Sequence, residues 1–229
     1  MARSGARTRR FSRLEYDRLI EAGFFRPDDR VELLGGQLVV AEPQGSHHYA
    51  ALRAAHEALR ALFGPGWEIR GQGPLALDDE SEPEPDVAVV PGSFRDYREA
   101  HPSRPVLVIE IAESSLALDR HHKGSLYARA GLADYWIANP AERTLEVYRD
   151  PGPDPATRFG WRYRAVTVLA RMGDGHAAGP AGPVGGRARS AGVIAPPVQG
   201  FAPWWDRKCA RSDRSWSPSP ASSCAIAPP

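Results

Sequence analysis

The chain has 229 residues, of which 25% are charged, and a formal net charge of +1 at pH 7. This balance gives no sign of a polyanion partner, so any contact with nucleic acid has to be local. Cys209 and Cys224 are the two cysteines, and their position near the end argues against a disulfide framework or a thiolate zinc site in the main body. No apolar run approaches the roughly 18 residues that span a bilayer, and we expect a cytoplasmic protein without membrane contact.

The first forty residues predict a helix followed by a β-hairpin. Ser12, three residues before Glu15, forms a capping-box pattern at the start of a short amphipathic helix that ends at Gly23. Two apolar segments joined by a Gly-Gly pair then predict paired strands over residues 30–41. Glu32 lies on the first strand between apolar neighbours, and its side chain can face either solvent or the interior.

A second helix and three strands follow in chain order. The helix extends from Ser46 to Gly64, and the periodicity predicts one apolar face that consists of Tyr49, Leu52, His56, Leu59 and Phe63. Strands are predicted over residues 67–70, 74–77 and 86–90, the last of which is entered through a proline-rich segment.

The strand predicted over residues 105–112 contains an unexpected charge. Alternation places Val106 and Val108 on the same face as Glu110, and the opposite face is also apolar, so the strand should be central and buried. Removing an unpaired carboxylate from water costs several kcal/mol. Glu110 therefore needs either a positively charged partner or a bound cation.

The remaining elements complete a mixed α/β fold. A helix is predicted over residues 118–130, and closing strands are predicted over residues 134–138, 144–149 and 161–170. Strands interspersed with helices indicate an α/β (α+β) protein in which helices flank one central mixed sheet, with the N-terminal helix and hairpin beside it.

The composition changes after about Arg171. Gly, Ala, Pro, Ser and Arg dominate residues 171–229, without helical or strand periodicity. Such a segment buries too little apolar surface to offset its ordering entropy, so it predicts a disordered tail behind a folded domain at residues 11–170. Translation of GC-rich DNA in a shifted reading frame would give the same composition.

Three polar residues could form a site where the predicted strands meet. If the two strands are neighbours, Asp86 and Glu110 could hold a hard cation such as magnesium or manganese through oxygen ligands. Lys123 follows on the next helix and could orient a water or stabilise phosphate charge. The plainer readings are a solvated strand entry for Asp86, a buried salt bridge for Glu110 and a surface position for Lys123.

Two histidine pairs, His47-His48 and His121-His122, lie at or near predicted helix starts. Adjacent residues on a helix do not share a face, so neither pair is expected to form a zinc site by itself.

Five sequence features together resemble the Uma-type restriction endonuclease family within the PD-(D/E)XK nuclease superfamily. They are the hairpin glutamate, PDVAVV, VIEIAESS, the DRHHK run and GLADYWIANP, in that order. The resemblance implies a restriction-endonuclease-like core and an Mg²⁺-dependent nuclease, with Mn²⁺ as a substitute. It assigns Asp86 and Glu110 as the motif acids that bind the metal, Glu32 as an accessory acid and Lys123 as the catalytic lysine.

The chain departs from the superfamily pattern at the lysine. The superfamily places this lysine two residues after the glutamate, where this chain has Ala112. The family that the chain resembles places it on the following helix, at Lys123.

The mechanism that the resemblance implies is in-line attack of a metal-bound water on a DNA phosphodiester, supported by Lys123. Glu32 would assist a second metal or hold the lysine. DNA is the expected partner, and a homodimer stays open as the assembly.

Two other function classes stay open. A catalytically inactive nuclease-fold protein would bind nucleic acid and keep the carboxylates as a salt bridge to Lys123. A glycosidase would use two carboxylates as acid and base, which explains Glu110 but gives Lys123 no role. Metal dependence separates these two classes from the nuclease, because only the nuclease requires magnesium for its activity.

Overall fold

The computed structural model describes residues 8–26, 28–41, 43–112 and 114–170, and the tail predicted at residues 171–229 lies outside them. In these ranges the helical segments are α1 (Arg13–Glu21), α2 (Ser46–Phe63), the 3₁₀ turn η1 (Phe94–Tyr97), the π-helix η2 (Leu118–Lys123) and α3 (Gly124–Arg129). The strands are β1 (Val31–Leu34), β2 (Gln37–Val40), β3 (Trp67–Gly71), β4 (Val87–Pro91), β5 (Leu107–Ile111), β6 (Asp134–Asn139), β7 (Thr144–Pro153) and β8 (Trp161–Ala170). Within these ranges, none of the helices has both the length and the apolar character that a membrane span requires.

The described strands form a six-stranded mixed sheet, in the order β3-β4-β5-β6-β7-β8, and a separate β1-β2 hairpin. Neighbours in the large sheet are antiparallel except β5 and β6, which are parallel. Parallel neighbours cannot be joined by a tight turn, so the chain crosses between them through η2 and α3. The predicted mixed α/β fold is confirmed, and β5 is an inner strand as expected.

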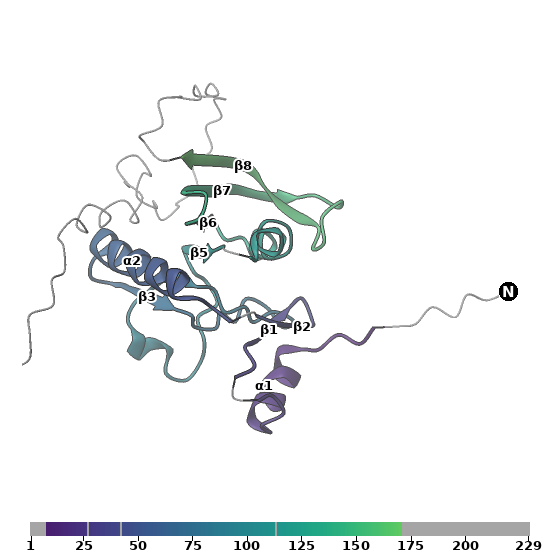
Figure 1. Ribbon diagram of the computed structural model, residues 1–229. Helices are drawn as coiled ribbons and strands as arrows, with labels where there is room; N and C mark the ends of the chain where they lie inside the picture. The colour runs from purple at the N-terminus through teal and green to yellow at the C-terminus, as the bar shows by residue number, and fades with distance from the viewer. Residues whose placement is uncertain (1–7, 27, 42, 113, 171–229) are drawn as a thin grey trace, which may run out of the picture.

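Alternate residues of the inner strands pack against different helices. One core cluster joins α2 side chains such as Leu52 and Leu59 to Val89 and Ile109. The other joins the opposite face of the same strands, including Val108, to α3. Figure 1 shows α2 on one side of the sheet and the helical segment between β5 and β6 on the other. Because both faces are covered, any polar side chain on β5 lies in the interior.

The hairpin and α1 form a smaller unit beside the sheet. Ser12 caps α1 through a capping box with Glu15, as predicted. Tyr16, Val31 and Leu33 form a third buried cluster between helix and hairpin. The backbone of Leu33 also pairs with that of Glu82, which ties the hairpin to the segment before β4. This tie brings Glu32 to the end of the sheet where Asp86 lies.

Three sequence expectations are wrong in detail. Residues 74–77, predicted as a strand, are an irregular connection in which Leu75 is buried. Tyr49, expected on the buried face of α2, is 60% exposed, and His48 is buried in its place. Val106 precedes β5 and packs with the α2 cluster, not on the face of Glu110.

Candidate active site

A cavity of about 300 Å³ opens where the hairpin, the start of α2, the strand ends and η2 meet. Its lining includes five carboxylates and two cationic side chains: Glu32, Glu84, Asp86, Glu110 and Asp119 against Arg30 and Lys123. All four residues assigned a site role from the sequence are therefore in one place. The excess of acidic groups gives the cavity a negative charge that a cation would complement.

Asp86 and Glu110 face each other across two neighbouring strands. Strands β4 and β5 are antiparallel, with Val87 opposite Ile109. Continuing this register by one residue places Asp86 opposite Glu110, on the same face of the sheet. The backbone N–H of Ile111 donates to Asp86 Oδ2 at 2.8 Å, which fixes the carboxylate at this point. The expected meeting of the two strands is confirmed.

One oxygen of Glu110 is held by two donors. Lys123 Nζ donates to Glu110 Oε1 at 3.1 Å, and the Tyr127 hydroxyl donates to the same oxygen at 2.8 Å. Burial raises the pKa of the Glu110 carboxyl well above its usual range, although Lys123 acts in the opposite direction. Glu110, whose charge the sequence left unexplained, thus has a cationic partner. Lys123 and Tyr127 both bind Oε1 of Glu110, and neither binds Oε2.

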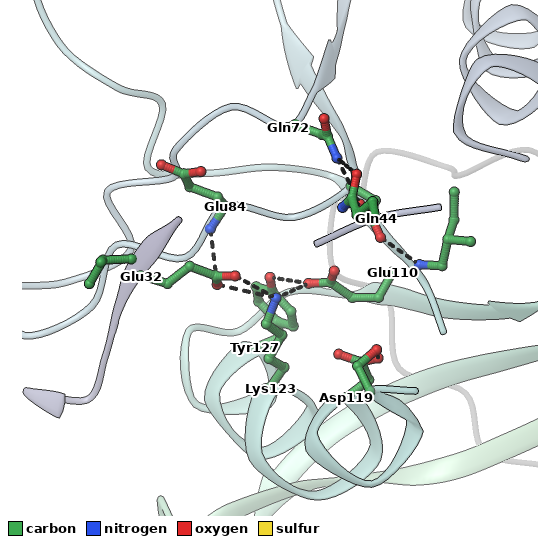
Figure 2. A network of polar contacts seen from close by, with 12 residues as sticks. Glu32, Gln44, Gln72, Glu84, Glu110, Asp119, Lys123 and Tyr127 are labelled. Carbon is green, nitrogen blue, oxygen red and sulfur yellow. Dashed lines mark hydrogen bonds and ion pairs between the residues drawn. The ribbon is translucent and has the colours of Figure 1, made fainter. Parts of the chain in front are cut away.

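Lys123 lies between two carboxylates (Figure 2). Its Nζ is 3.1 Å from Glu110 Oε1 and 3.1 Å from Glu32 Oε2. Burial alone would lower the pKa of Lys123, but the carboxylates of Glu110 and Glu32 outweigh this effect and raise it. Lys123 therefore stays protonated, and its expected orientation toward the acids is confirmed. Glu32 holds the lysine and also accepts from the backbone N–H of Glu84 at 3.2 Å.

The π-helix η2 positions Lys123. The N–H of Gly124 donates to the carbonyl of Asp119, five residues earlier, so this turn is wider than an α-helical turn. A Cβ on Gly124 would lie 3.2 Å from that carbonyl oxygen, and the close approach favours glycine. Asp119 and Lys123 are both buried and both line the cavity. Burial, opposed by Lys123, raises the pKa of Asp119 to about 6.

Three side chains donate to one oxygen of Asp86. They are His48 Nε2 at 2.8 Å, Gln44 Nε2 at 3.1 Å and Gln72 Nε2 at 3.3 Å, all to Oδ1. Burial would raise the pKa of Asp86, but the hydrogen bonds from His48 and Ile111 outweigh it and lower the pKa. Of the two facing acids, Asp86 is therefore ionised more readily than Glu110.

Sequence reasoning assigned no role to these three donors. His48 was noted only as half of a histidine pair and lies on the buried face of α2. Of the other histidines in the two pairs, His47 and His121 are exposed and His122 packs against Phe159. His48 is three and four residues before the buried Ala51 and Leu52, and this spacing could have placed it on the buried face of α2. No local sequence pattern indicates that Gln44 or Gln72 binds Asp86.

The donor set fits a hard divalent cation. Asp86 and Glu110 offer carboxylate oxygens beside a roomy cavity, and Mg²⁺ is commonly held by one or two carboxylates with water and substrate phosphate as further ligands. Within the described ranges, no group of three or more His, Cys, Asp and Glu side chains is arranged to hold a metal ion. Asp86 and Glu110 are the two acids that the sequence assigned to the metal, and both line this cavity.

The sequence matches one family model, and the chain is similar to a solved structure. The model of the Uma2 family, described as "Putative restriction endonuclease", matches residues 13–171. No curated protein matches the chain. A solved structure titled as a putative nuclease belonging to DUF820, from Anabaena variabilis ATCC 29413, is similar at 20% identity and a TM-score of 0.48, over 67% of this chain and 84% of that one. Because the family match spans well over half of its length, this chain belongs to the Uma2 family of putative restriction endonucleases.

Proposed function

We propose that this protein is a metal-dependent endonuclease that hydrolyses DNA phosphodiester bonds. The observation that supports the proposal best is the position of Lys123, a buried ammonium that contacts Glu110 while Asp86 directly precedes the neighbouring strand β4. A salt bridge that served the fold alone would not require a cavity with an excess of carboxylates around it. The family to which the chain belongs supports the same activity.

Asp86 and Glu110 would hold a divalent cation, with Mg²⁺ as the first expectation and Mn²⁺ as a substitute. Bound there, the cation supplies Lewis acidity and offsets the negative charge that develops on the phosphate. Asp86 Oδ1 and Glu110 Oε1 are both held by protein donors, so the carboxylates are fixed before substrate arrives. Such fixed acids lower the cost of reorganisation during the reaction.

Lys123 would act as a hydrogen-bond donor. Its raised pKa keeps the ammonium protonated at neutral pH, so Lys123 is unsuited to be the general base. An ammonium has three N–H donors, and here they contact both oxygens of Glu32 and Oε1 of Glu110. A water or phosphate oxygen in the cavity would take one of these donors in place of a Glu32 oxygen. Glu32 would keep the ammonium in this position, and Arg30 offers a phosphate contact in the same lining.

Cleavage of supercoiled plasmid DNA tests the proposal. The wild-type protein should nick the plasmid with Mg²⁺ or Mn²⁺ and leave it intact in excess chelator, because the two carboxylates need the cation to act. Glu110→Gln should be inactive under both conditions. Single-stranded DNA and RNA tested in parallel identify the substrate class. DNA binding without cleavage at any metal concentration would contradict the proposal and identify a nuclease fold that only binds.

A further inference from the structure

Gln72 has an unfavourable backbone conformation. It follows β3 directly and has a φ of 51°, in the left-handed region that glycine prefers. Gly71 and Gly73 flank it, yet the position with the unfavourable φ is occupied by glutamine, which has a long amide side chain. Among the described non-glycine residues, Arg143 and Asp150 share this conformation. Such strain persists where the surrounding structure imposes it, often at functional sites.

Both the main chain and the side chain of Gln72 contact Asp86. The backbone N–H of Gln72 donates to the carbonyl oxygen of Asp86 at 3.0 Å. The side-chain amide donates to Asp86 Oδ1 at 3.3 Å and to Gln44 Oε1 at 2.5 Å. Figure 2 shows Gln72 and Gln44 next to each other, joined by a dashed line, above Glu110. The strained backbone thus directs an amide at the carboxylate and at the neighbouring glutamine that also binds it.

The donors divide unevenly between the two oxygens of Asp86. Oδ1 accepts from Gln44, His48 and Gln72, whereas Oδ2 accepts from the N–H of Ile111. A carboxylate offers about four lone-pair sites, two on each oxygen. Oδ1 is therefore fully used by the protein, and Oδ2 retains room for a further partner. The arrangement orients Asp86 as a ligand with one anchored oxygen and one available oxygen.

Gln72 acts on the site through other residues. Gln44, His48 and Asp86 belong to the lining of the cavity in the described part of the chain, and Gln72 does not. A residue that supports a ligand from outside the cavity changes metal affinity by orienting that ligand, and loss of such a partner commonly weakens metal affinity or activity by about 10–100-fold.

From this geometry we infer that Gln72 is a positioning residue, held in a strained conformation so that its amide, together with Gln44, anchors Asp86 Oδ1 and leaves Oδ2 for the cation. The inference rests on the proposed function, since it assumes that Asp86 binds a metal ion. According to this inference, the unfavourable backbone conformation of Gln72 serves to position Asp86 and does not stabilise the fold. Glycine at this position should therefore suit the backbone better while it impairs the site.

The test compares metal affinity with stability in the full chain. Calorimetric titration with Mn²⁺ and thermal unfolding without metal are measured for the wild type, Gln72→Gly and Gln72→Ala. Both variants should bind Mn²⁺ about tenfold more weakly. Gln72→Gly should unfold at the wild-type temperature or up to about 4 °C above it, because the strain is relieved. Arg143→Gly, which relieves a similar φ of 56° in the exposed turn between β6 and β7, is the matched control and should keep wild-type affinity.

The outcomes separate this inference from the proposal on which it rests. If the wild type itself does not bind Mn²⁺, the metal site is refuted, and the inference with it. If the wild type binds and both Gln72 variants bind equally well, only the inference is overturned. If Gln72→Gly unfolds well below the wild type or fails to fold, the residue serves the fold, and the inference is again overturned.

Discussion

Replacement of Lys123 by methionine should destabilise the protein strongly, even though methionine fills a similar volume. The Lys123 ammonium is 3.1 Å from a carboxylate oxygen of Glu32 and 3.1 Å from one of Glu110, and all three side chains are at most 6% exposed. Removal of one partner from a buried ion pair costs about 3–5 kcal/mol, because the remaining charge is left unpaired. This is a large share of the about 5–15 kcal/mol that stabilises a typical domain.

The pH dependence of the Lys123→Met effect distinguishes buried charge from lost packing. Lys123 is the main influence that opposes the raised pKa of Glu110, so its removal should leave that pKa still higher in the folded state. A carboxyl with a raised folded-state pKa contributes stability below its unfolded pKa, about 4.3, and loses that contribution as the pH rises through the folded value. The deficit of Lys123→Met relative to wild type should therefore be small near pH 4.5 and large at pH 8.

Urea denaturation of both proteins at several pH values measures this deficit. Adding Glu110→Gln to Lys123→Met should recover part of the lost stability, since one unpaired charge is removed. Arg53→Met is the control, because it breaks the exposed pair with Glu57, which is worth about 0.3–0.5 kcal/mol. Equal unfolding free energies for Lys123→Met and wild type at pH 8, or a deficit that does not change with pH, would refute the buried-charge account.

Two further predictions each concern one side chain. Tyr127→Phe removes one of two donors to Glu110 Oε1 and should weaken Mn²⁺ binding about tenfold by calorimetry. Tyr135→Phe loses a buried hydroxyl that donates to a backbone carbonyl, and this control should bind Mn²⁺ as the wild type does. Equal affinities of the two variants would contradict the role of Tyr127 in holding Glu110. Burial raises the pKa of Glu82 to about 7, so its contribution to stability is lost as the pH rises from about 4.5 through 7. Glu82→Gln should reduce the decline in unfolding free energy between pH 5 and pH 8 by about 1–3 kcal/mol, and an unchanged pH profile would show that the carboxyl is not perturbed.

The periodicity of the sequence predicted the fold because both faces of β5 had to be covered. The strand from Leu107 to Ile111 reads as apolar on each face, and the structure places helices on both. Residues 74–77 misled the prediction because a short apolar segment carries no information about its partner strand. Leu75 is buried there in the core cluster between the sheet and α3, without a ladder of backbone pairs.

The acids and the lysine of the site could be predicted, whereas most of the groups that hold them could not. Glu110 was conspicuous because a charge in an apolar strand requires a partner. His48 was overlooked because a shift of one position along α2 assigned Tyr49 to the buried face. Gln44 and Gln72 reach Asp86 from segments 42 and 14 residues away, and such contacts follow from the folded arrangement, not from local pattern.

Calorimetric titration of the metal-free protein with Mn²⁺ tests the central claim most directly, because it requires no substrate. The wild type should show clear binding, and Asp86→Ala and Glu110→Ala should each remove it, since each variant deletes one of the two carboxylates that would hold the ion. Circular dichroism confirms that the variants are folded. Clear wild-type binding that survives in both variants would contradict the account and place the metal elsewhere in the protein.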